Sequence, residues 1–351
     1  MGGYGGGGAK RGYDEAEKGD GMIFRKAGRE VEWAEELGDL SWNYRAARIV
    51  QVACGVGMFR RLAEGRVTAT DVAGGDLEAE MVEKVFIALA AMGLAARQGK
   101  GWMLTAKARA TLLEESPLYQ GHMLAHSAQV WSYWNDFESA VRGERGGWVW
   151  SAEGQPQART HRDFILAMHE MAMAGRAAAM AEQVDLEGRR TLVDVGGGPG
   201  TYAMALCERN PDLAATVMDL PETIEIAREV IGRLGMGERV RTQVGDWNTD
   251  EFGRGSDAVL LSNILHGPTS AAEMKLEKAH RALRPGGLLI VQDFLMNAEK
   301  TGPLIPALFN VMVGAFSVTE LTDLIAAAGF RDLRVKPMPE RVGTTLVTAV
   351  R

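Results

Sequence analysis

Residues 191–200 of this chain read Thr-Leu-Val-Asp-Val-Gly-Gly-Gly-Pro-Gly. The apolar run predicts a short buried strand, and the pattern from Thr201 onward predicts a helix. The turn between them carries almost no side chains, so a ligand can approach the backbone and the start of the helix. Asp219 follows at the end of the next apolar run. A strand, a glycine loop, a helix and a second strand that ends in an acid are the order in which an open parallel sheet holds an adenosyl cofactor.

The spacing of the glycines separates two classes of cofactor. Gly196, Gly198 and Gly200 form a G-x-G-x-G pattern with Pro199 inside it, whereas the dinucleotide pattern is G-x-G-x-x-G. The loop is therefore closer to the pattern of enzymes that use S-adenosylmethionine than to that of NAD enzymes. On the loop alone, a tight strand–helix turn without a ligand stays open as the alternative.

Strands and helices continue to alternate downstream of the loop. Asp246 follows another apolar run, and a buried strand from Asp257 leads to His266. The last two strand-like runs are joined by a short connection, which predicts an antiparallel pair. The alternation predicts an α/β fold with a seven-stranded sheet. The later elements are a helix over 272–283, a strand over 288–291, a helix over 318–328, and strands over 333–336 and 344–350.

Five motifs together carry a family resemblance over residues 40–351. They are Val193-Asp-Val-Gly-Gly-Gly-Pro-Gly200, Met218-Asp-Leu-Pro221, Gly245-Asp-Trp247, Leu265-His266 and Leu283-Arg-Pro-Gly-Gly287. In order and spacing the chain resembles the small-molecule O-methyltransferases of the caffeic-acid and hydroxyindole type, including bacterial members. The resemblance implies a class I S-adenosylmethionine-dependent methyltransferase with a Rossmann-like sheet and an N-terminal all-helical winged-helix dimerisation domain.

The same resemblance implies a division of the chain into four parts and assembly as a homodimer. Its expected parts are a disordered or extended segment over 1–35, the winged-helix-like dimerisation domain over 36–115, linking helices that roof the substrate pocket over 116–185, and the cofactor-binding catalytic domain over 186–351.

The N-terminal module raises a competing class of function, a DNA-binding regulator with a ligand-sensing domain. Residues 68–73 and 77–94 predict helices, and 95–105 predict a two-stranded wing around a Gly-Lys-Gly turn. A recognition helix needs basic residues that meet phosphates, but residues 76–94 carry four acids and one lysine. We therefore expect a protein partner for this helix and no nucleic acid.

Bulk properties agree with a cytoplasmic enzyme. A net charge of −7 argues against a general binder of nucleic acid or anionic membranes. Cys54 and Cys207 lie far apart and show no metal-ligand spacing, so we expect buried thiols and no metal. The chain shows no apolar stretch long enough to span a membrane and no signal pattern at its start, and we expect a cytoplasmic location.

The resemblance implies a set of cofactor contacts. Asp219 should accept hydrogen bonds from the ribose hydroxyls. Asp246 and Trp247 should contact the edge and the face of the adenine. Asp194 should orient the loop or meet the cofactor ammonium through water. The full set is Asp194, Gly196, Gly198, Asp219, Leu220, Asp246, Trp247 and Ser262.

Helices over 119–137 and 161–182 should roof the pocket of a small-molecule acceptor. Methionine and aromatic side chains suit flat, irregular substrates, although for any single residue an ordinary core position remains the alternative. The candidate substrate residues are His126, Trp131, Phe164, Met168 and Met171.

His266 is the candidate catalytic base, with Asp293 to orient its ring. A hydroxyl acceptor must lose its proton, and histidine has a suitable pKa for that step. Members of the family commonly have two further acids nearby, but Gly267 and Ala315 stand at those positions here. The expectation is therefore O-methylation with His266 as the base. Methylation of a thiol, thioether or amine, with His266 only positioning the substrate, remains open.

Overall fold

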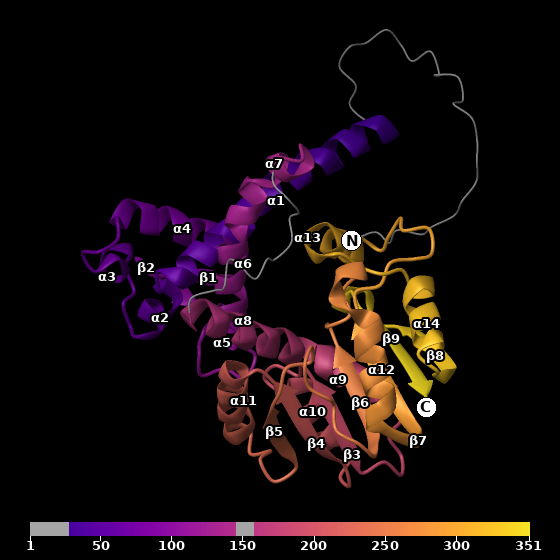
Figure 1. Ribbon diagram of the computed structural model, residues 1–351. Coiled ribbons are helices and arrows are strands. Elements are labelled where there is room, and N and C mark those ends of the chain that lie inside the picture. The colour runs from indigo at the N-terminus through magenta and orange to yellow at the C-terminus, as the bar shows by residue number, and fades with distance from the viewer. Residues whose placement is uncertain (1–27, 145–157) are drawn as a thin grey trace, which may run out of the picture. The chain divides into compact units, whose positions relative to one another are not determined.

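The structure is a computed structural model that describes residues 28–144 and 158–351 (Figure 1). The chain forms two compact units, residues 1–48 and 49–351. The described part of the first unit is the start of helix α1 (Arg29–Gly55). This helix begins well before Leu40, where the periodic pattern predicted the first helix, so residues 29–35 are helical and not extended. Most side chains from 29 to 48 are exposed, and six of the eleven residues from 29 to 39 are charged, which obscures the few apolar residues at helical spacing.

The start of the second unit consists of short helices followed by a two-stranded antiparallel hairpin, at the positions where the sequence predicted helices and a hairpin. Thr68 and Asp71 form a reciprocal capping box at the start of the second of its short helices. Two antiparallel strands make the wing, so the module is not all-helical. Phe86 stacks on Trp102 at 5.5 Å between ring centroids, which packs the long helix against the wing. The elements are α2 (Met58–Ala63), α3 (Ala69–Ala73), α4 (Ala79–Ala91), β1 (Ala95–Gln98), β2 (Gly101–Leu104) and α5 (Ala106–Leu112).

The predicted roof helices are present, but the second is interrupted. A π-helical segment (Ala172–Arg176) separates α8 from α9, and Gly175 within it has φ +100°, a value that glycine adopts without strain. The periodic pattern runs through this segment, so the sequence predicted one helix over 161–182. The elements are α6 (Gly121–Asn135), α7 (Phe137–Val141), α8 (Ala158–Met171) and α9 (Ala177–Gln183).

Seven strands form one sheet in the order β5-β4-β3-β6-β7-β9-β8. Strands β3 to β7 run parallel to one another, and β9 runs antiparallel to both β7 and β8, which confirms the predicted terminal hairpin. The strands are β3 (Thr191–Val195), β4 (Ala214–Asp219), β5 (Val240–Val244), β6 (Ser256–Ser262), β7 (Leu283–Asp293), β8 (Arg331–Pro337) and β9 (Thr345–Val350).

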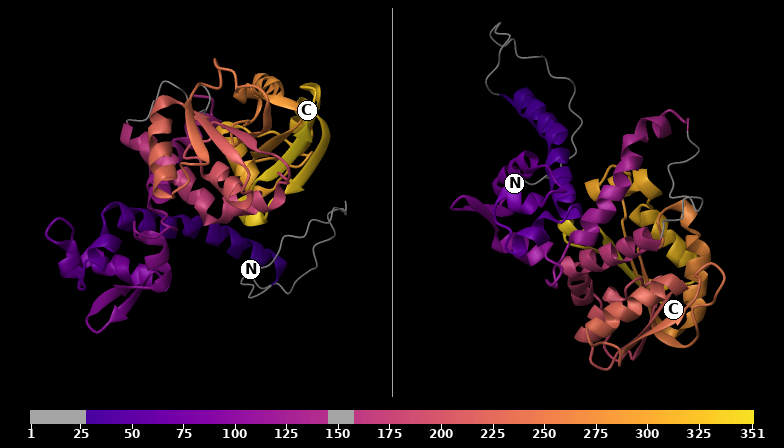
Figure 2. Two further views of the ribbon diagram at one scale, coloured as in Figure 1. Left: turned by 90° about the horizontal axis from the view of Figure 1, so that it is seen from below. Right: turned by 90° about the vertical axis from the view of Figure 1, so that its left-hand side faces the viewer.

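Helices cover both faces of this sheet (Figure 2). Each face has its own apolar core. Helices α9, α10 and α11 pack on one face, and α12 and α14 pack on the other. Because β3, β6 and β7 are covered on both sides, their residues form nearly continuous apolar runs. The helices are α10 (Thr201–Arg209), α11 (Pro221–Arg233), α12 (Ala272–Ala282), α13 (Leu304–Val313) and α14 (Val318–Ala327), with short 3-10 turns at Pro268–Ser270 and Glu340–Val342.

Within the described ranges, no helix combines the length and the apolar character that crossing a membrane requires. The same residues contain no group of three or more His, Cys, Asp or Glu side chains that could hold a metal ion.

Candidate active site

The glycine loop lies at the carboxyl edge of the sheet, between β3 and α10. Gly196 and Gly198 have φ of +63° and +55°, in the left-handed region that favours glycine. A Cβ at Gly196 would lie 2.4 Å from the ring of Trp247, whereas a Cβ at Gly198 would meet no atom within 4 Å. The loop is therefore closely packed at Gly196 and open at Gly198, where a ligand could approach the backbone.

Asp219 ties the end of β4 to this loop. Its Oδ2 accepts a hydrogen bond from the Gly198 amide at 2.8 Å, and its Oδ1 accepts one from the Leu220 amide at 2.8 Å. Burial raises the pKa of Asp219, and the two amides act in the opposite direction. The carboxyl ends of β3 and β4 thus place the predicted ribose acceptor directly beside the open part of the loop.

Asp194 is a buried carboxylate on which only the backbone amide of Ala203 acts as a donor, and its geometry is poor. The residue is 1 % exposed, and neither carboxylate oxygen makes a hydrogen bond of normal geometry. Burial, reinforced by the nearby Asp219, raises the pKa of Asp194 to about 7. A buried polar group of this kind calls for an explanation, and a cationic ligand group at the loop would supply the missing donor. The acceptor groups of this edge therefore fit S-adenosylmethionine, whose ribose hydroxyls and ammonium are donors.

Trp247 and its neighbours form the third part of the edge. Asp246 Oδ1 accepts a hydrogen bond from the Asn248 amide at 2.8 Å, which shapes the turn after β5. Lys278 of α12 donates to three carbonyls of this turn, those of Trp247, Asn248 and Asp250. Among the other predicted cofactor residues, Leu220 is 41 % exposed, and Ser262 accepts a hydrogen bond from the side-chain amide of Asn263 at 3.1 Å.

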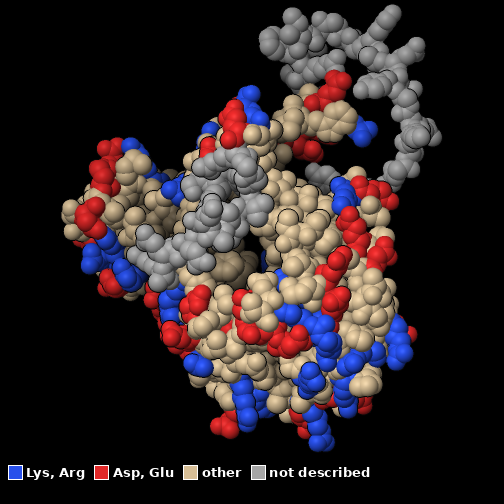
Figure 3. Space-filling model, in the orientation of Figure 1, with Lys and Arg blue, Asp and Glu red and all other residues tan. Residues whose placement is uncertain are grey.

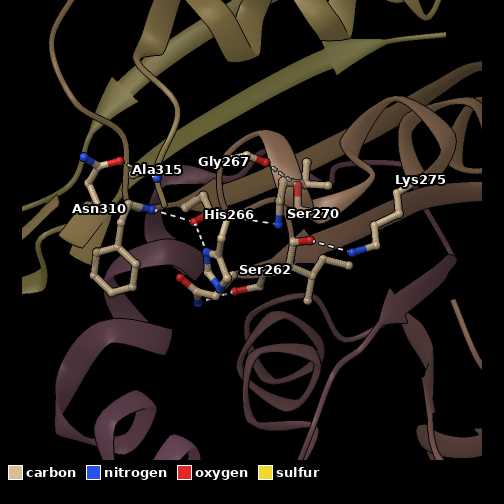
Figure 4. A network of polar contacts seen from close by, with 12 residues as sticks. Ser262, His266, Gly267, Ser270, Lys275, Asn310 and Ala315 are labelled. Carbon is tan, nitrogen blue, oxygen red and sulfur yellow. Dashed lines mark hydrogen bonds and ion pairs between the residues drawn. The ribbon is translucent and has the colours of Figure 1, made fainter. Parts of the chain in front are cut away.

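His266 does not lie on a strand, as the sequence suggested, but in the loop after β6, which ends at Ser262. Its Nδ1 lies 2.8 Å from Asp293 Oδ1, and Asp293 Oδ2 accepts the Leu265 amide at 3.0 Å (Figure 4). The carboxylate thus fixes both the loop and the ring. A proton on Nδ1 that points at the carboxylate leaves Nε2 as the basic nitrogen. The ring also packs against Phe309, with 4.9 Å between centroids.

The structure explains why the position after the histidine carries no acid. Gly267 has φ +57°, and a Cβ there would lie 3.0 Å from the backbone nitrogen of Ala315 and 3.1 Å from Gly314 C. The backbone amide of Ala315 in turn donates to Asn310 Oδ1 at 3.0 Å (Figure 4). The two positions that lack the family's acids therefore face each other, and a side chain at 267 would need that backbone to move. Within the described chain, Asp293 is the carboxylate that contacts His266.

The roof helices bring some of the predicted substrate residues together. The rings of His126 on α6 and Phe164 on α8 meet edge to face with 5.2 Å between centroids. Burial lowers the pKa of His126, which favours its neutral form. Trp131, Met168 and Met171 are partly buried on the same pair of helices.

Sequence reasoning missed the contacts that attach α8 to the cofactor edge. His169 Nδ1 lies 2.8 Å from Thr201 Oγ1, at the start of α10. His161 Nε2 lies 3.1 Å from Thr223 Oγ1, in the first turn of α11. Both pairs join residues far apart in sequence, so no local pattern indicates them.

The sheet order, the glycine loop and the acids at the following strand ends define the class of the protein as an S-adenosylmethionine-dependent methyltransferase. Comparisons with known proteins agree. Residues 130–331, more than half of the chain, match the family model of the O-methyltransferase domain, and the chain belongs to this family.

Two curated relatives illustrate the range of the family. Over 165 residues the chain is 38 % identical to a 3-hydroxy-5-methyl-1-naphthoate 3-O-methyltransferase of Streptomyces sahachiroi, a match that spans 45 % of this chain and about half (48 %) of that relative. Over 336 residues it is 27 % identical to the N,N-dimethyltransferase OxyT of Streptomyces rimosus, covering 92 % of this chain and 97 % of OxyT. The names of these relatives differ in the methylated atom.

A solved structure matches the fold. Human N-acetylserotonin methyltransferase, crystallised in complex with S-adenosylmethionine, superposes with a TM-score of 0.79 at 24 % identity, covering 93 % of this chain and 99 % of the human chain.

Proposed function

We propose that the protein methylates a hydroxyl group of a small aromatic acceptor and that His266 removes the proton. The observation that supports this most is the contact between His266 Nδ1 and Asp293 at 2.8 Å, since it presents Nε2 as an acceptor in a ring held by a carboxylate. The established family leaves the acceptor atom open, so the chemistry of this pair must decide it.

S-adenosylmethionine supplies the methyl group. The acceptor oxygen forms a bond to the methyl carbon as the S–CH3 bond breaks, and the hydroxyl proton passes to His266 Nε2. Asp219 would hold the ribose hydroxyls, Trp247 and Leu220 the adenine, and Asp194 the ammonium. Holding both reactants in one orientation in a dry pocket supplies much of the rate.

The absence of the two usual acids favours one second candidate, methylation of a sulfur or nitrogen atom. Gly267 and Ala315 leave His266 with Asp293 as its carboxylate partner. A thioether or a neutral amine needs little or no base strength, and OxyT is an N,N-dimethyltransferase. In that case His266 would position the acceptor, and its loss would raise KM.

The substitution His266→Ala separates these candidates. Hydroxynaphthoates and hydroxyindoles serve as hydroxyl probes, with aryl thiols and amines of similar shape beside them. If His266 is the base, kcat on the hydroxyl probe falls about 100-fold or more, while the affinity for S-adenosylhomocysteine, measured by calorimetry, stays unchanged. The deficit should shrink at high pH and with more acidic phenols, because these ionise without help.

The outcome that contradicts the base assignment is an undiminished kcat of the variant on the preferred hydroxyl acceptor. The second candidate is supported if His266→Ala changes only the KM of the acceptor and its kcat does not rise at high pH. In that case the enzyme should also turn over the thiol or amine probe faster than the hydroxyl probe. Asp293→Asn serves as the companion variant, because it should lower kcat with the same pH trend if the carboxylate acts through the imidazole.

We also propose that the chain acts as a homodimer. Trp33, Leu37, Leu40 and Tyr44 follow one another on α1 at spacings of four, three and four residues, and they are 50 %, 68 %, 70 % and 48 % exposed. Exposed apolar stripes of this length mark interaction sites. A DNA-binding role has less support, since Lys84 of α4 pairs with Glu80 and Arg97 of the wing pairs with Glu83. On the face in Figure 3, acidic side chains lie among the basic ones around this module.

A further inference from the structure

Lys275 is a buried lysine between the cofactor edge and the loop of the candidate base. The residue lies on α12 and is 4 % exposed. Its Nζ donates to the carbonyl of Ile264 at 2.9 Å, a contact visible in Figure 4. The same Nζ lies 4.5 Å from the centroid of the Trp247 ring, within the range of a cation–π contact. One ammonium therefore touches two loops that serve different parts of the proposed reaction.

These two loops also meet the glycine loop at the same point. A Cβ at Gly196 would lie 2.4 Å from the Trp247 ring and 3.1 Å from the side chain of Ile264. Ile264 precedes His266 by two residues in the loop after β6. A shift of the Trp247 ring would therefore displace Ile264 and, through the backbone, the imidazole of His266.

The charges around Lys275 come from both halves of the site. Burial lowers its pKa to about 8, and the carboxylates of Asp293 and Asp246 act in the opposite direction. Asp293 is the partner of His266, and Asp246 precedes Trp247. A buried cation is costly unless its surroundings compensate it. One compensating carboxylate, Asp246, lies in the turn of Trp247, and the other, Asp293 at the end of β7, holds the loop of His266.

Lys278, one turn of helix away, offers a matched comparison. Its Nζ donates to three carbonyls of the Trp247 turn, at 2.9, 2.9 and 3.0 Å. Within the described residues, its Nζ contacts this turn and the Phe252 ring and does not contact the loop of His266. Lys278 thus holds one loop, whereas Lys275 holds two.

We propose that Lys275 is a positioning residue that couples the cofactor to the base, because it fixes the Trp247 ring and the Ile264 carbonyl at the same time. This inference rests on the proposed roles of Trp247 and His266. In this proposal, α12 helps to align the bound methyl donor with His266, the group that takes the proton of the acceptor.

The test compares Lys275→Met, Lys275→Arg and Lys278→Met, with Arg281→Met as the surface control on the same helix. Calorimetry measures the affinity for S-adenosylhomocysteine, and initial rates give kcat at saturating methyl donor. Lys275→Met should lower both quantities about tenfold, an effect between those of exposed and desolvated cation–π contacts. Lys278→Met should weaken binding but lower kcat less than Lys275→Met does, and Arg281→Met should change neither quantity, since Arg281 pairs with Glu251 at the surface.

The pH dependence of the affinity for S-adenosylhomocysteine distinguishes this role from a purely structural one, because a purely structural lysine would not change it. As the pH rises through about 8, Lys275 loses its charge, and the affinity of the wild-type protein should fall. Arginine stays charged throughout this range, so Lys275→Arg should retain affinity at pH 7 and lose this alkaline decline. The decline caused by the amino group of the ligand itself will be common to both proteins.

The coupling is overturned if Lys275→Met, still folded by thermal melting, binds and turns over like the wild type. It is also overturned if the wild type and Lys275→Arg decline identically with pH. The binding measurements do not depend on how the acceptor proton is removed, so a failed base assignment for His266 would leave them unaffected.

Discussion

At the scale of single residues, two carboxylates at the glycine loop show how binding capacity and stability oppose each other. Asp219 accepts a backbone amide on each oxygen, whereas neither buried oxygen of Asp194 makes a hydrogen bond of normal geometry, although the Ala203 amide favours its charged form. Because the pKa of Asp194 is raised to about 7 in the folded chain, its ionisation opposes folding. The stability that the protonated form provides is lost as the pH rises from about 4, where the unfolded carboxyl ionises, to about 7.

The substitution Asp194→Asn should therefore stabilise the ligand-free protein at pH 7.5, because it removes a buried charge without changing the shape of the side chain. It should also weaken the binding of S-adenosylhomocysteine about tenfold, if the carboxylate meets the ligand ammonium. Thermal melting with and without the ligand measures both effects. Asp212→Asn, on the exposed turn before β4, is the control. A variant that is less stable yet binds normally would contradict this role for Asp194.

The residues of the site differ in how far the sequence could predict them. Asp194, Asp219 and Asp246 were predictable, because the carboxyl ends of parallel strands meet at one edge of a sheet. The contact of His266 with Asp293 was expected from the family resemblance and is present. Lys275 was not predicted, since its burial depends on how α12 packs, and an Ala-Glu-Met-Lys sequence has no local sign of it.

At the scale of elements, helix α8 is attached to the cofactor edge by a titratable contact. His169 is buried against Thr201 at the start of α10. Burial, the charge of Arg233 and the neighbouring His122 lower the pKa of His169 to about 4. The unfolded chain therefore binds a proton that the folded chain does not, between about pH 6.5 and pH 4, and the stability contributed by neutral His169 is lost as the pH falls through this window.

The substitution His169→Gln should make the stability of the protein less sensitive to pH between 6.5 and 4. Glutamine can still hydrogen-bond Thr201 but does not titrate, so the wild type should lose about 3 kcal/mol more than the variant across this window. Denaturant unfolding at several pH values gives the comparison. Equal slopes for the two proteins would show that His169 does not carry this dependence. His280→Gln is the comparison variant: the ring of His280 packs on Phe330, burial lowers its pKa less than that of His169, and its loss should therefore change the slope less.

Other elements show where sequence patterns reach their limit. The strands and the terminal hairpin were predictable from apolar runs and turns. Helices α11 and α13 were not predicted. In α13 the apolar residues are not confined to one face, and Leu304, Leu308 and Val311 are exposed. The break at Gly175 was also missed, since a single left-handed residue leaves the apolar period intact.

At the scale of the whole molecule, the described chain leaves apolar surface uncovered in both of its compact units. In the first unit the stripe on α1 contains Trp33, Leu37, Leu40 and Tyr44. In the second unit, α13 exposes Leu304, Leu308 and Val311, again at helical spacing. A monomer in water gains nothing from such stripes, whereas a second copy of the chain could bury them.

Light scattering at micromolar concentration should therefore give the mass of a dimer. The double substitution Leu37→Glu and Leu40→Glu places two charges in the α1 stripe, and burying them would cost several kcal/mol, so this variant should scatter as a monomer or dissociate on dilution. Val335→Glu introduces the same charge on the exposed edge strand β8 and should leave the dimer intact.

A wild-type protein that is monomeric and fully active would contradict the homodimer. A double variant that stays dimeric would instead exclude the α1 stripe from the interface. If the partner chain completes the acceptor pocket, the monomeric variant should also show a raised KM for the acceptor while it still binds S-adenosylhomocysteine.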